Sequence, residues 1–115
     1  MKTLEELIPL IEQWAEEKGI IEADQPLAQM RKMQEEVGEL WEAVGQIQSL
    51  DGYHYAKQLD EWRDKLKDAI GDVLVTVIVQ AKLQNVDIYE CLNLAYDTIT
   101  KRKGKMIDGV FVKDK

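Results

Sequence analysis

The segment at residues 69–79 constrains the fold more than any other part of the chain. It is rich in β-branched residues, a composition typical of a buried strand. However, Leu66, Ile70, Val73 and Val77 share one helical face, and no turn residue separates the segment from the preceding one. We therefore predict a helix that begins near residue 54 or 55, ends near residue 84 and is enclosed on most sides.

Two further helices are predicted before this segment, because apolar residues recur there at helical spacing. A capping-box pattern that begins at Thr3 predicts the start of the first helix, and Gly19 predicts its end. Asp24 followed by Pro26 predicts the start of the second helix, which continues to about Asp51.

A fourth helix and a short tail complete the chain. Asp87 is the expected N-terminal cap of this helix, and Gly104 is its expected C-terminal cap. In the tail, Asp108 and Gly109 separate two short apolar stretches, a pattern that favours a small hairpin.

The simplest architecture is an all-α, four-helix antiparallel bundle. We expect the bundle to comprise residues 1–104, with an extended or hairpin tail at residues 105–115 that packs on the domain or on a partner subunit. A chain of 115 residues forms one small domain with little room for a core. Association with further copies would cover more apolar surface, so we expect a homodimer or a homotetramer.

Charge and cysteine content exclude several classes of protein. The net charge of −7 argues against binding to a nucleic-acid polymer or to an anionic membrane. The single Cys91 excludes an internal disulfide and a cysteine-based zinc site. The first residues lack an apolar signal region, and the longest apolar stretch is too short to span a bilayer. We expect a cytoplasmic protein.

Two groups of acidic residues lie against the predicted helix faces. Glu36 lies at the edge of the apolar stripe of the second helix, with Glu39 and then Glu35 further round. Asp72 lies within the apolar segment, where we expect it to be buried, and Asp68 lies one turn earlier. A buried carboxylate needs a cation partner or a proton. Carboxylates from two helices suit a hard divalent cation, Mg²⁺ first, although a solvated acidic face remains the alternative.

At this point the sequence resembles the MazG-like, all-α nucleotide pyrophosphohydrolases. The resemblance lies in three stretches, which read QEEVGEL at residues 34–40, DAIGDVLV at residues 68–75, and RKGKM followed by GVFVK at residues 102–113. It covers nearly the whole chain. It implies hydrolysis of a nucleoside or deoxynucleoside triphosphate between its α and β phosphates, giving a monophosphate and pyrophosphate.

The resemblance also implies roles for individual residues. Glu36, Glu39 and Asp72 match the metal ligands, with Mg²⁺ as the expected ion and Mn²⁺ as the alternative. Glu35 or Glu36 is the candidate base that accepts a proton from the attacking water. Lys101, Arg102 and Lys105 are candidate phosphate-binding residues, with a solvated basic tail as the alternative. Trp14 and Trp41 are candidates to border a nucleobase pocket, although core packing is the favoured role for each of them.

One departure from the family pattern concerns the second motif, E-x-x-D. Ala69 stands where the family has the glutamate, and Asp68, displaced by one residue, is the candidate replacement as a metal ligand. Two alternatives to a catalytic enzyme therefore stay open. One is a nucleotide-binding or metal-binding relative that has lost turnover through Ala69. The other is a non-enzymatic helical assembly module.

Overall fold

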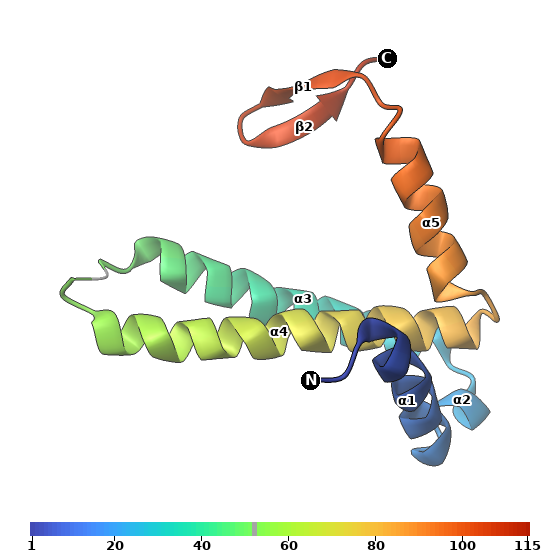
Figure 1. Ribbon diagram of the computed structural model, residues 1–115. Helices are drawn as coiled ribbons and strands as arrows, with labels where there is room; N and C mark the ends of the chain where they lie inside the picture. The colour runs from blue at the N-terminus through green and yellow to red at the C-terminus, as the bar shows by residue number, and fades with distance from the viewer. Residues whose placement is uncertain (52) are drawn as a thin grey trace. The chain divides into compact units, whose positions relative to one another are not determined.

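The computed structural model describes residues 1–51 and 53–115, which divide into two compact units at Met1–Asn85 and Val86–Lys115. The described residues form five helices and one two-stranded sheet (Figure 1). In chain order these are α1 Leu4–Glu17, α2 Ile20–Ala23, α3 Pro26–Ser49, α4 Ala56–Leu83, α5 Ile88–Ile99, β1 Gly104–Ile107 and β2 Val110–Lys113.

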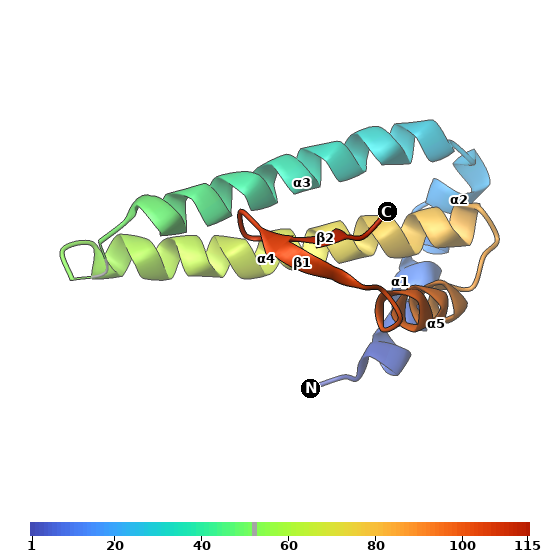
Figure 2. The same cartoon turned by 90° about the horizontal axis from the view of Figure 1, so that it is seen from above.

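The first unit is built around α3 and α4, which lie side by side and run in opposite directions (Figures 1 and 2). The segment at residues 69–79 is helical, as predicted, and lies inside the uninterrupted helix α4. Small buried side chains at Ala43 on α3 and Ala69 on α4 leave little bulk between neighbouring helices. Gly38 on α3 and Gly71 on α4 do not lie at a close approach of this kind, because a Cβ at either position would meet no atom within 4 Å.

Helix α1 packs against α4 and supplies the rest of the core. The buried apolar residues of this unit are Ile8 and Ala15 on α1, Ala43 on α3, and Ala69, Ile78, Val79 and Ala81 on α4. An ion pair between Lys82 Nζ and Glu16 Oε1, 3.2 Å apart, also joins α1 to α4. The Gln80 side chain donates a hydrogen bond to the Pro26 carbonyl oxygen and so ties α4 to the start of α3.

The helix starts follow the sequence closely. Thr3 and Glu6 form the predicted capping box of α1, and the Asp87 side chain accepts the amide hydrogens of the first turn of α5. The start of the second predicted helix differs in detail. Asp24 has left-handed backbone geometry at φ 50° and ends the short, unpredicted helix α2, whereas Gln25 precedes Pro26 as the N-cap of α3.

The second unit contains α5 and the hairpin β1–β2. The hairpin prediction is confirmed: Asp108 and Gly109 both have positive φ, at 49° and 81°, and join antiparallel strands. The prediction that Gly104 caps the last helix is wrong. Helix α5 ends at Ile99 with Thr100 as its C-cap, and Gly104 is the first residue of β1. A Cβ at Gly104 would collide with the Val112 carbonyl oxygen, so the strand pairing requires glycine there.

The helical content agrees with the predicted all-α class, but α5 belongs to the second unit, so the four-helix antiparallel bundle stays a prediction. The same holds for the predicted division between residues 104 and 105. Among the residues that the structure describes, no single helix is long and apolar enough to cross a membrane. The pair α4 and α5 meets that test jointly, on length and composition only.

Candidate metal centre

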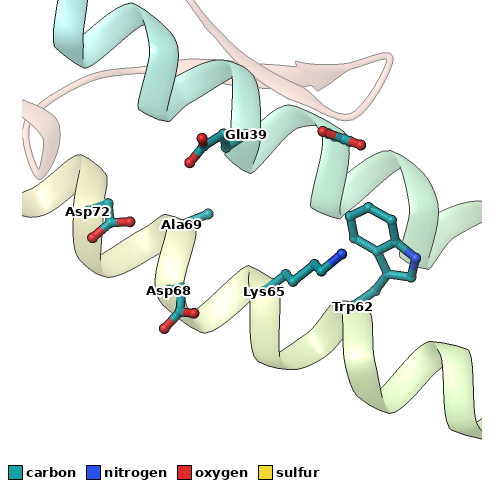
Figure 3. Close-up of a pocket in the computed structure, with 7 residues that line it drawn as sticks. Glu39, Trp62, Lys65, Asp68, Ala69 and Asp72 are labelled. Atoms are coloured by element: carbon teal, nitrogen blue, oxygen red, sulfur yellow. The ribbon is translucent and has the colours of Figure 1, made fainter.

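Three carboxylates converge between α3 and α4. Glu36 and Glu39 come from successive turns of α3, and Asp72 comes from the middle of α4. One carboxylate oxygen of each lies within 4.8 Å of one oxygen of each of the others. Figure 3 shows Glu39 and Asp72 on the two helices that face each other at this point. Residues from two helices thus form one group of oxygen ligands, which we call the carboxylate cluster.

Glu36 is the buried member of the cluster. Only 7% of its surface is exposed, and its Oε2 atom is buried without a hydrogen-bond partner. The other oxygen, Oε1, lies 3.1 Å from Lys32 Nζ. An unsatisfied buried polar atom costs about 1–3 kcal/mol, and a charged one costs more. A divalent cation held by the cluster would satisfy Glu36 Oε2, so this oxygen fits a metal site.

The electrostatics of the cluster reflect its crowding. The Glu36 carboxylate, through hydrogen bonding and charge, raises the pKa of Glu39, and Asp72 adds a smaller contribution in the same direction. A raised pKa in the folded state means that the folded protein binds this proton more tightly than the unfolded chain. The contribution of Glu39 to stability is therefore present at low pH and is lost as the pH rises through the raised pKa. Glu39 is therefore less favourable to the fold when it is ionised, because its charge lies beside those of Glu36 and Asp72.

Two pockets, each of about 320 Å³, meet at Asp72. The first is polar and is shown in Figure 3; its lining residues are Glu39, Glu42, Trp62, Lys65, Asp68, Ala69 and Asp72. The second has an apolar wall beside the cluster, and its lining residues are Trp14, Ile20, Gln29, Lys32, Glu36, Asp72, Val75, Thr76 and Val79. The cluster therefore borders both a polar pocket and a partly apolar one.

The expected site residues on α3 and α4 separate into those in the cluster and those beside it. Asp72 belongs to the cluster, but it is exposed, so the expectation that it is the buried carboxylate is wrong and Glu36 has that property. Asp68 lines the polar pocket outside the cluster of three. The Glu35 side chain is 68% exposed and lies 3.5 Å from Lys32 Nζ.

The remaining expected residues lie outside the carboxylate cluster. Trp14 lines the partly apolar pocket beside Glu36, whereas Trp41 is 81% exposed on α3. The three basic residues expected at the phosphates, Lys101, Arg102 and Lys105, are exposed residues of the second unit. Their role and that of the two tryptophans stay predictions.

Lys32 is a feature of the site that the sequence reasoning missed. It pairs with Glu36 and Glu35, which follow it by four and three residues, a spacing at which helical side chains meet. The Glu36 and Glu35 charges and hydrogen bonds raise the pKa of Lys32, so its ammonium form is favoured. The i, i+4 spacing of Lys32 and Glu36 in the sequence could have indicated this ion pair.

Comparison with known proteins identifies the family of this chain. Residues 24–107 match the family described as the MazG nucleotide pyrophosphohydrolase domain. This chain belongs to that family. A relative from Haemophilus phage HP1, an uncharacterized 18.2 kDa protein of the rep-hol intergenic region, is 34% identical over 87 residues. The match covers 76% of this chain but 45% of the relative. The MazG match includes all three residues of the carboxylate cluster.

Proposed function

We propose that this MazG-family chain is a Mg²⁺-dependent pyrophosphohydrolase that converts a nucleoside or deoxynucleoside triphosphate and water into the monophosphate and pyrophosphate. The observation that carries the proposal is the convergence of Glu36, Glu39 and Asp72 around a buried carboxylate oxygen without a partner. Oxygen ligands of this kind suit Mg²⁺, with Mn²⁺ as the alternative, and Mg²⁺ ordinarily binds through a few carboxylates together with substrate phosphates.

Glu36, Glu39 and Asp72 hold the cation in this proposal. When bound, the cation would neutralise phosphate charge and lower the pKa of the attacking water. The protein's own contribution is to hold the phosphate chain and to accept the proton that the water loses. Glu35 is the proposed acceptor, because it is next to Glu36 in the chain but remains 68% exposed, with access to solvent.

The partly apolar pocket is the proposed place of the nucleobase. Trp14 offers an aromatic face there, and Val75 and Val79 extend the apolar wall. The same pocket reaches Glu36 and Asp72, so a base in it would have its phosphate chain beside the cluster. Trp41 is assigned a lesser part because of its exposure. Lys101, Arg102 and Lys105 remain proposed phosphate-binding residues.

One observation favours a second candidate, a relative with weakened turnover. Ala69 is 4% exposed and lines the polar pocket together with Asp72, at the position where the family pattern has a glutamate. The chain therefore lacks one carboxylate that the complete E-x-x-D motif would direct to this place. A non-enzymatic assembly module is disfavoured by the buried, unpartnered Glu36 oxygen, because assembly requires no such group.

We predict a homo-oligomer, a dimer or a tetramer, at micromolar concentration. Large apolar side chains are exposed on both units, among them Leu74 at 53%, Leu92 at 62% and Leu94 at 60%. Along α1 and α4 such residues line a groove of about 350 Å³. Sedimentation velocity measures the state directly, and a stable folded monomer across the micromolar range would refute the prediction.

The experiment that tests the proposed function is Asp72→Asn. Asparagine has nearly the same shape as aspartate. Because Asp72 is also exposed, we expect the melting temperature of the metal-free protein to stay equal or to rise slightly. We expect Mg²⁺-dependent pyrophosphate release to fall by about a hundredfold or more, since even residues behind a metal ligand affect such sites by about 10- to 100-fold. Full activity in this variant would remove Asp72 from the site.

A further inference from the structure

Lys32 and Glu36 form a contact between a surface cation and a buried anion. Lys32 Nζ lies 3.1 Å from Glu36 Oε1 and 3.5 Å from Glu35 Oε2. The Lys32 side chain is 55% exposed, while that of Glu36 is 9% exposed. The ammonium therefore reaches Glu36 from the solvent side, and it uses one oxygen while the other stays unpartnered.

The surroundings of Lys32 leave room for a second anion. Lys32, Glu36 and Asp72 line the same pocket of about 320 Å³. A lysine ammonium is a compact charge with three donors on a flexible stem, so it can change partners with small movements. Phosphate oxygens that entered this pocket beside the cluster would be within reach of the ammonium.

The charges predict opposite effects of Lys32 on two ligands. A bare divalent cation that approaches Glu36 is repelled by the ammonium and must share the carboxylate with it. A metal–triphosphate complex is different, because its phosphate oxygens give the ammonium a better partner than the shared carboxylate. Binding of the cation and binding of the phosphate chain are then thermodynamically coupled through one residue.

We propose that Lys32 is the internal counter-ion of the carboxylate cluster: it competes with a bare divalent cation for Glu36 and pairs with the phosphate chain once a metal–triphosphate complex binds. The inference rests on the proposed function and adds a residue and a coupling to it. Lys32 thereby favours the productive complex over metal alone.

The test compares two titrations of the full chain by calorimetry, one with MgCl₂ alone and one with the preformed Mg²⁺–tripolyphosphate complex. In Lys32→Met we expect bare Mg²⁺ to bind about tenfold more tightly and the Mg²⁺–tripolyphosphate complex to bind about tenfold more weakly, a size typical of coupled sites. Lys32→Arg retains the charge and is expected to keep both wild-type affinities within about threefold.

Lys82→Met is the matched control. Lys82 forms an ion pair of nearly the same length, 3.2 Å, with Glu16, so the variant loses the same charge and a similar contact away from the cluster. We expect both of its affinities to stay near those of the wild type. A purely structural role for Lys32 would move both affinities in the same direction and would overturn the inference, as would unchanged affinities in Lys32→Met. If the wild type binds no Mg²⁺ in either titration, the proposed function fails as well.

Discussion

Glu36→Gln is expected to abolish binding of Mg²⁺ and to stabilise the metal-free protein. Glutamine has nearly the same shape but lacks the charge, and its amide group can donate a hydrogen bond within the cluster. Removal of the buried charge leaves Lys32 in contact with solvent, where it is already 55% exposed. We expect the free energy of unfolding to rise by about 1 kcal/mol, because removal of a desolvated charge beside Glu39 and Asp72 outweighs loss of the pair with the partly exposed Lys32. Thermal melting with and without Mg²⁺ measures both effects.

Two further variants make this result specific. Glu35→Gln changes the adjacent, 68% exposed carboxylate and is expected to keep Mg²⁺ affinity while it lowers turnover, because Glu35 is the proposed proton acceptor. Glu22→Gln changes an exposed carboxylate on α2, outside the cluster, and controls for loss of one negative charge. Wild-type Mg²⁺ affinity in Glu36→Gln would contradict the assignment of the buried oxygen to a metal.

Ala69→Glu is expected to raise both Mg²⁺ affinity and turnover by about tenfold, since it adds the carboxylate of the family motif. Figure 3 shows Ala69 on the side of α4 that faces α3. This residue lines the polar pocket of about 320 Å³ together with Asp72. Ala69 is buried, and the longer side chain would extend from it into this pocket. Calorimetric Mg²⁺ titration and initial rates measure the two gains. A folded variant with unchanged affinity and rate would show that the missing glutamate has no influence here.

Asp68→Ala separates the role of Ala69 from that of its neighbour. Asp68 lines the same pocket, but its oxygens are not in the cluster of three. A loss of Mg²⁺ binding as large as in Glu36→Gln would make Asp68 the replacement for the family glutamate. In that case Ala69→Glu in the Asp68→Ala background should restore binding. A smaller loss would assign the site to the three clustered residues.

The elements of the fold were predictable where local interactions determine them. The capping box at Thr3, the Asp87 cap and the Asp108–Gly109 turn each depend on residues within a few positions of one another. The helical character of residues 69–79 followed from spacing, which outweighed their β-branched composition. The role of Gly104 was predicted wrongly because glycine is common both at helix ends and where two strands lie very close. Only the position of the partner strand at Val112 distinguishes these two roles.

Burial within the site was less predictable, because it depends on packing between helices. Asp72 stands among apolar residues in the sequence yet is exposed, whereas Glu36 at the edge of a stripe is buried. The packing of each helix against its neighbours determines which of the two carboxylates is buried. The spacing of residues within one helix does not predict that packing. Lys32 was missed for another reason. Its pairing with Glu36 is visible as an i, i+4 spacing, but on most helices such pairs are ordinary surface contacts.

The most direct test of the proposed pyrophosphohydrolase activity is pyrophosphate release from a panel of nucleoside and deoxynucleoside triphosphates, measured with Mg²⁺ and with excess EDTA. We expect equal amounts of pyrophosphate and nucleoside monophosphate from at least one triphosphate, dependence on Mg²⁺, and loss of both products in Glu36→Gln and Asp72→Asn. Release of orthophosphate and diphosphate would contradict it, because the bond broken would then be the one between the β and γ phosphates. Absence of any product across the panel, with folded protein that binds Mg²⁺, would contradict it equally.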